Sequence, residues 1–98
     1  MISLKKEETR EYSFAEALVE VTYKIPTAAE AETVLNEKWK NTEVFKKFVK
    51  TVKSADVEGW ENGVKAEDVV SLPGTFNLVT LVTFDIVKDM RAEAQRKN

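Results

Sequence analysis

Apolar and polar residues alternate most clearly in the segment "LVEVTYKIP", residues 18–26. Its apolar positions share one side of an extended chain: Val19, Val21, Tyr23 and Ile25. A period of two, with β-branched and aromatic residues, is typical of a half-buried strand. Pro26 ends the predicted strand, because proline cannot donate a hydrogen bond to a sheet.

A single strand needs a neighbour for its backbone groups. The candidate neighbour is "REYSF", residues 10–14, joined to the first strand as a hairpin through residues 15–17. No Asn-Gly or Asp-Gly turn supports this hairpin, so pairing with another subunit stays open as the alternative. Residues 1–9 are expected to form a loosely ordered tail, with a short edge strand within residues 1–11 as the other possibility.

A helix is expected directly after Pro26. Thr27 can cap its first turn, and Glu30 stands three residues later, where it completes a capping box. The apolar positions that follow fall at helical spacing on one side: Ala31, Val34, Leu35 and Trp39.

A second helix is expected from Asn41 or Thr42 to about Lys53. Its apolar stripe consists of Val44, Phe45, Phe48, Val49 and Val52. Its opposite side carries the lysines Lys46, Lys47, Lys50 and Lys53. Because the two sides differ so clearly, the lysines are interpreted as the solvated face of a helix and not as a footprint for nucleic acid.

The last part of the chain predicts a long helix over residues 76–98, preceded by one or two helical turns in "KAEDVVSL" that end at Pro73. One face of the long helix gathers apolar residues: Phe76, Val79, Val82, Ile86 and Met90. Residues 76–87 are rich in β-branched side chains, so a buried strand is the alternative for that part.

These elements predict an α+β fold dominated by helices, with an N-terminal strand or hairpin, two consecutive amphipathic helices and a long C-terminal helix. The 98 residues suit one domain, residues 1–98, and the 43% of apolar residues can form one modest core. No stretch approaches the roughly 20 apolar residues of a membrane span, and no signal peptide is recognisable. We therefore expect a soluble cytoplasmic protein that has no membrane partner.

Cysteine and histidine are both absent. Their absence excludes thiol nucleophiles, cysteine-ligated zinc and triads of the Ser-His-Asp type. The net charge of −2 is spread along the chain, which argues against a nucleic-acid partner. We expect no catalytic residue, no metal and no other cofactor.

Four carboxylates gather near Trp60 in the sequence: Glu58, Glu61, Glu67 and Asp68. Glycoside hydrolysis needs two carboxyl groups at a fixed separation, one of them with its pKa raised by burial. The spacing here fixes no such separation, so surface carboxylates are the simpler interpretation. A small hydrolase that uses this group is kept as a hypothesis.

Residues 56–76 hold all three glycines, one of the two prolines and one of the two tryptophans. Trp60 in this segment either fills a gap between packed elements or offers a binding hot spot to a partner. Packing is the simpler interpretation, and it makes the segment a connector anchored by Trp60. Trp39, at the end of an apolar stripe, is expected in the core by the same reasoning.

Several features follow one another in a recognisable order: an apolar strand that runs into "IPTAAEAE", a helical "NTEVFKKFVKTV", then "VEGWENG" and "AEDVVSLPGTFNLVTLV". In this order the chain resembles the tail assembly chaperones of long-tailed bacteriophages, over about residues 18–88. These small proteins of the tail gene cluster are often encoded just before the tape measure protein.

The resemblance implies a binding protein of the host bacterial cytoplasm and not an enzyme. Its implied partners are the tape measure protein, in some phages the tail tube protein, and further copies of itself in a homo-oligomer. The family has no site motif that can be matched residue by residue, so the contact candidates Phe48, Trp60 and Val82 come from the apolar positions above. The alternative is a structural protein of the virion, for tail completion or head–tail joining, which would form stable rings.

Overall fold

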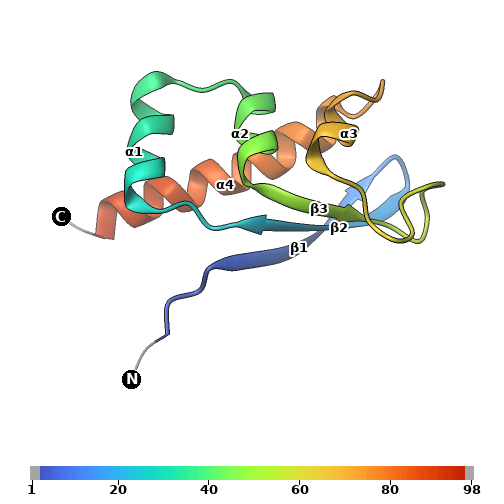
Figure 1. Cartoon of the computed structure of the whole chain (residues 1–98), viewed down its shortest axis with the longest axis horizontal. Helices are drawn as coiled ribbons and strands as arrows, with labels where there is room; N and C mark the ends of the chain where they lie inside the picture. Colours follow the sequence, from blue (N-terminus) through green and yellow to red (C-terminus); the bar gives the residue numbers. More distant parts are fainter. Residues whose placement is uncertain (1–2, 97–98) are drawn as a thin grey trace.

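A computed structural model describes the backbone of residues 3–96 and the side-chain surroundings of residues 3–91. Three antiparallel strands form a sheet in the order β1-β2-β3, and the helices pack against one of its faces (Figure 1). The elements follow one another as β1 (Glu7–Phe14), β2 (Ala17–Lys24), α1 (Ala28–Glu37), α2 (Asn41–Phe48), β3 (Val49–Lys53), α3 (Ala66–Val70) and α4 (Phe76–Arg96). The predicted α+β fold with a long C-terminal helix is confirmed.

The predicted first strand is β2, the central strand of the sheet, and its neighbour in the hairpin is β1 of the same chain. The turn between them consists of Ala15 and Glu16, whose φ angles are both positive, 50° and 66°. Two successive positive φ angles suit the twist of a two-residue hairpin, but such turns usually contain Asn-Gly. A residue with a Cβ is strained in this conformation, so the turn could not be recognised from its residues.

β1 begins at Glu7, so the edge-strand alternative holds for residues 7–11, and the loose tail does not extend to residue 9. Thr9 lies opposite Thr22, with their hydroxyl oxygens 3.0 Å apart. The Ile25 amide donates to the Lys6 carbonyl at 2.9 Å, so the pairing with β2 continues as far as residue 6. Backbone pairing therefore orders a segment that has few apolar side chains.

The capping box predicted for the first helix is confirmed in α1. The Glu30 amide donates to the Thr27 hydroxyl at 3.1 Å, and the Thr27 amide donates to the Glu30 carboxylate at 2.9 Å. Lys24 pairs with the same carboxylate at 2.9 Å. These contacts hold the pKa of Glu30 below its ordinary value, chiefly through the hydrogen bond from the Thr27 backbone.

The second helix ends at Phe48, and the prediction that it continues to Lys53 is wrong. The next residue, Val49, already belongs to β3 and pairs with Tyr23 of β2. The tertiary context outweighs the helical pattern here, because residues 49–53 form backbone pairs with β2 and pack against its side chains.

A β-bulge explains why the pattern looked helical. Val49 lies opposite Tyr23 and Thr51 lies opposite Thr22, which leaves Lys50 as an extra residue on β3. The bulge lets both Val49 and Val52 face the core, although residues three apart in a regular strand face opposite sides. The spacing of three residues between the apolar Val49 and Val52, which resembles a helix, is thus produced by an irregular strand.

The long C-terminal helix is confirmed as α4, and the strand alternative for residues 76–87 is not realised. Its buried face consists of Leu78, Val79, Val82, Ile86 and Met90. Phe76 was expected on this face but is 71% exposed, because it lies about 90° around the helix from the centre of that face. In the described part of the chain, none of the helices has both the length and the apolar character of a membrane span.

Candidate functional site

The three residues predicted to contact a partner lie in the core. Phe48, Trp60 and Val82 are 1%, 4% and 0% exposed, respectively. All three belong to one cluster of buried side chains that joins the sheet to the helices. None of them offers a surface to a partner in the folded chain, so replacing any of them would report on stability.

The packing interpretation of Trp60 is confirmed. Its ring stacks on Phe14 of β1, with ring centres 6.5 Å apart and planes inclined by 5°. Its backbone amide donates to Val57, and its carbonyl accepts from Ser54 and from Gly63. The segment around Trp60 is therefore a connector that this side chain anchors, as the sequence indicated.

The same connector closes the outer edge of β3. The Val52 amide donates to the Val64 carbonyl at 3.0 Å, and the Val64 amide donates back at 2.8 Å. Beyond the end of β3, the Ser54 hydroxyl donates to the Leu18 carbonyl, and the Leu18 amide donates to the Asp56 carboxylate. The outward backbone groups of Val52, the amides of Ser54 and Leu18, and the Leu18 carbonyl thus find partners within the chain.

The four carboxylates near Trp60 in the sequence are all exposed: Glu58, Glu61, Glu67 and Asp68. They lack the burial that the hydrolase hypothesis requires of a general acid. Among the residues that the structure describes, no group of three or more acidic side chains is placed to hold a metal ion.

Large apolar side chains remain exposed on α4 and just before it. Phe76, Leu81 and Phe84 of α4 are 71%, 48% and 66% exposed, and Leu72, in the turn that precedes the helix, is 46% exposed. Leu81 and Phe84 are three residues apart and therefore neighbours on the helix surface. We call these four residues the α4 apolar surface, and it is the strongest candidate for partner contact.

A polar cluster ties β1 and β2 to α4. Tyr12 donates to Asp85 at 2.6 Å, and Tyr23 donates to Asp89 at 2.9 Å. The Arg10 guanidinium lies 3.7 Å from Asp85 and 3.6 Å from Asp89. The two aspartates are four residues apart and so share one side of the helix.

The surroundings of the polar cluster raise the pKa of both tyrosines. Burial raises the pKa of Tyr12, and its hydrogen bond to Asp85 and the charge of that carboxylate raise it further. Burial likewise raises the pKa of Tyr23, and its hydrogen bond to Asp89 and the charge of that carboxylate raise it further. Burial lowers the pKa of Arg10, but Tyr23 and the two aspartates outweigh this effect and raise it. The tyrosines thus stay protonated donors, and the polar cluster holds α4 on the sheet.

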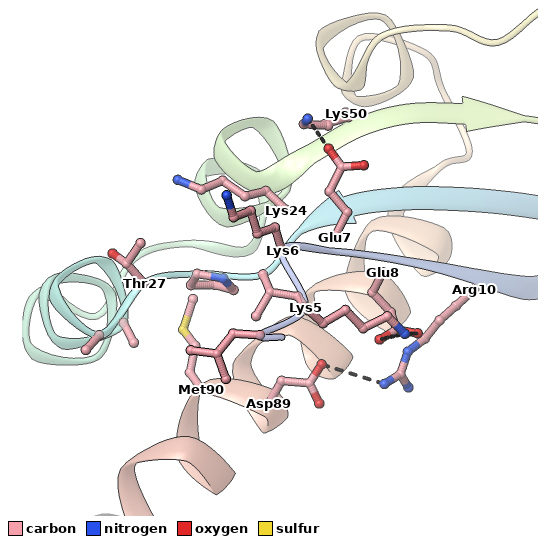
Figure 2. A pocket seen from close by; sticks show the side chains of 15 residues that line it. Lys5, Lys6, Glu7, Glu8, Arg10, Lys24, Thr27, Lys50, Asp89 and Met90 are labelled. Atoms are coloured by element: carbon pink, nitrogen blue, oxygen red, sulfur yellow. Dashed lines mark hydrogen bonds and ion pairs between the residues drawn. The ribbon is translucent and has the colours of Figure 1, made fainter. Parts of the chain in front are cut away.

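An open groove of about 850 Å³ lies between the N-terminal segment, the start of α1 and α4 (Figure 2). Its apolar lining includes Leu4, Ile25, Pro26, Ala31 and Met90. Around it, Lys5 pairs with Glu8, Lys50 with Glu7 and Arg10 with Asp89. The lining holds five basic side chains and three acidic ones, and Lys24 pairs with Glu30 outside the lining, so the groove carries a small excess of positive charge.

Neither the α4 apolar surface nor the polar cluster was predicted as a site. The sequence carried a signal for the polar cluster. Arg10, Tyr12 and Phe14 share one side of a strand because they are two residues apart, and Asp85 and Asp89 share one side of a helix because they are four apart. The sequence also carried a signal for the exposure of Phe84, because helical spacing places this residue on the polar side of the helix, opposite the predicted apolar face.

No family model, curated protein or solved structure matches this chain.

Proposed function

We propose that this protein is a tail assembly chaperone of long-tailed bacteriophages, which acts in the host cytoplasm by binding and not by catalysis. Its client is the tape measure protein, the tail tube protein, or both. It covers apolar surface on the client until the tail tube polymerises.

The observation that carries this proposal is the α4 apolar surface. A chaperone of this kind must present apolar side chains while it remains folded, and exposed apolar neighbours such as Leu81 and Phe84 mark contact sites of this kind. Phe76 and Phe84 are more than half exposed, whereas the opposite face of α4 is fully packed. The resemblance over about residues 18–88 supports the same function.

The rest of the molecule suits this role because it keeps α4 in place without using its outer side. The polar cluster binds the helix to β1 and β2, and Thr83 donates to the Asn41 carbonyl at the start of α2. The helix can then offer its exposed side to a client while the core stays closed.

The test is co-expression with a tape measure protein from the same genome, followed by size-exclusion chromatography with light scattering. We expect the tape measure protein to become soluble and to co-elute. Phe84→Ser should reduce the co-eluting amount at least about tenfold, since burial of a phenylalanine contributes about 1.5–3 kcal/mol.

Leu18→Ser is the matched control, because Leu18 is 59% exposed but lies on the outer face of the sheet. It should leave co-elution unchanged. A tape measure protein that stays insoluble, while this protein alone forms a stable ring, would favour a structural role in tail completion or head–tail joining. Equal losses in both variants would remove the α4 apolar surface from the proposal.

A further inference from the structure

The outer edge of β1 has no backbone partner among the residues that the structure describes. The Ile25 amide donates to Lys6, so the even-numbered residues of this strand direct their backbone groups to β2. Because the direction alternates along a strand, the odd-numbered residues direct theirs away from the sheet: Glu7, Thr9, Glu11 and Ser13. All four are exposed, and among the described residues none of their outward groups has a backbone partner.

We propose that β1 pairs antiparallel with β1 of a second copy of this chain, which makes one continuous six-stranded sheet. Only odd-numbered residues can donate outward, so odd-numbered residues must face odd-numbered residues of the second copy. Residues opposite each other share a face of the sheet. The two copies are therefore related by a two-fold axis perpendicular to the sheet, with all helices on the same side.

A row of threonines selects the register. Thr9, Thr22 and Thr51 lie side by side across the outer face of the three strands. If Thr9 faces Thr9 of the second copy, the row continues through all six strands, and opposed threonines favour pairing. The pairing then extends from residue 6 to residue 12 of each copy.

Charges agree with a two-fold axis at Thr9. Glu8 then faces Arg10 of the second copy, twice by symmetry, whereas an axis at Arg10 or Glu11 would oppose like charges. The unfavourable contact of Glu7 with Glu11 also occurs twice by symmetry, and it is weakened because Glu7 already pairs with Lys50. An axis at Tyr12 would avoid like charges too, but the chain turns after Phe14 and fewer residues could pair.

The pairing does not rest on the proposed function, but one consequence does. With the helices of both copies on one side of the sheet, the two α4 apolar surfaces face the same way. A dimer would then offer a client twice the apolar area of a single chain.

Single-cysteine variants test the register directly, because the chain contains no cysteine. In a backbone-bonded antiparallel pair the opposing Cα atoms are about 5.5 Å apart, within the range of disulfides. Thr9→Cys should give a covalent dimer under mild oxidation. Glu11→Cys and the control Thr33→Cys, on the exposed side of α1, should give at least about fivefold less dimer, since neither lies on the axis.

A proline variant tests the pairing without a cross-link. The Glu11 amide points outward, so Glu11→Pro leaves the bonds to β2 intact while it removes two bonds across the dimer. The dimer dissociation constant should rise about tenfold or more, at about 1 kcal/mol per bond, and Glu11→Ala should leave it nearly unchanged. A monomeric wild-type chain at tens of micromolar, or cross-linking equal at Thr9 and Thr33, would overturn the proposal whether or not a client is bound.

Discussion

The two edge strands of the sheet, β3 and β1, differ in whether another segment of the chain pairs with them. At β3, the segment from residue 54 to residue 64 folds back, pairs Val64 with Val52, and accepts the Ser54 amide at the Trp60 carbonyl. At β1, the described part of the chain supplies no such cover. The connector, with its glycines and its tryptophan, belongs to the first edge. Within residues 3–96 no similar segment pairs with the second edge, which is where we propose that a partner strand binds.

The strands at the two edges are also held by different forces. Val49 and Val52 of β3 are buried among apolar side chains. Arg10 and Tyr12 of β1 are half-buried and meet α4 through hydrogen bonds and charges. One edge therefore depends on the hydrophobic effect, and the other depends on the protonation state of its polar groups.

The largest expected effect comes from opening the closed edge. Trp60→Ala removes a buried aromatic side chain and should lower the free energy of unfolding by about 3–5 kcal/mol. Urea denaturation measures this loss, and amide exchange at Val52 and Val64 should accelerate. Trp39→Ala is the control, because Trp39 is only partly buried, and its loss should be less than half as large. Similar losses in the two variants would contradict the role given to Trp60.

A smaller effect is expected at alkaline pH in the polar cluster, which joins β1 and β2 to α4. The folded state raises the pKa of Tyr12 and Tyr23 above the ordinary value of about 10. The stability that their protonated hydroxyls contribute is fully present below that value and is lost as the pH rises above it. Urea denaturation at a series of pH values from 9 to 11 should therefore show falling stability.

The matched variant for this pH series is the double substitution Tyr12→Phe with Tyr23→Phe. It should be less stable than the wild type near neutral pH, because each hydroxyl bond contributes about 1–2 kcal/mol. Its stability should also fall less steeply above pH 10. Parallel curves for the wild type and the variant would show that these hydroxyls do not govern the alkaline loss.

The smallest expected effect is a gain in stability at the hairpin turn. Glu16 has a φ angle of 66°, which glycine adopts without strain. Glu16→Gly should raise the free energy of unfolding by about 0.5–1 kcal/mol, as measured by thermal or urea denaturation. Glu20→Gly, in the extended backbone of β2, should lower it instead, and a loss in both variants would argue against strain in the turn.

The sequence predicted those elements whose local signals agree with their packing. β2 alternates cleanly, Thr27 and Glu30 form the predicted box, and the apolar face of α4 runs from Val79 to Met90. In each case the residues that favour the secondary structure are also placed to fit the packing of the fold. An element can be predicted from a single sequence when its local signals agree with its packing in the fold.

The remaining features depend on contacts between distant residues, which one sequence does not reveal. The strand β3 exists because residues 49–53 meet β2, and its bulge imitates the spacing of a helix. Phe48 and Val82 looked like contact residues, but the fold closes over both, while Phe84 stays outside. The spacing along α4 predicts which of its sides is apolar, but whether that side is covered within the chain depends on its neighbours.

The direct passage from α2 to β3, without a single residue between Phe48 and Val49, restricts how chains of this kind can vary in length. One residue inserted there would rotate the helix by about 100° relative to the sheet or move the following side chains to the opposite face. Insertions are far easier to accept in the connector beyond β3, which can lengthen at the surface. The β-bulge at Lys50 shows how a strand of this sheet accommodates one extra residue.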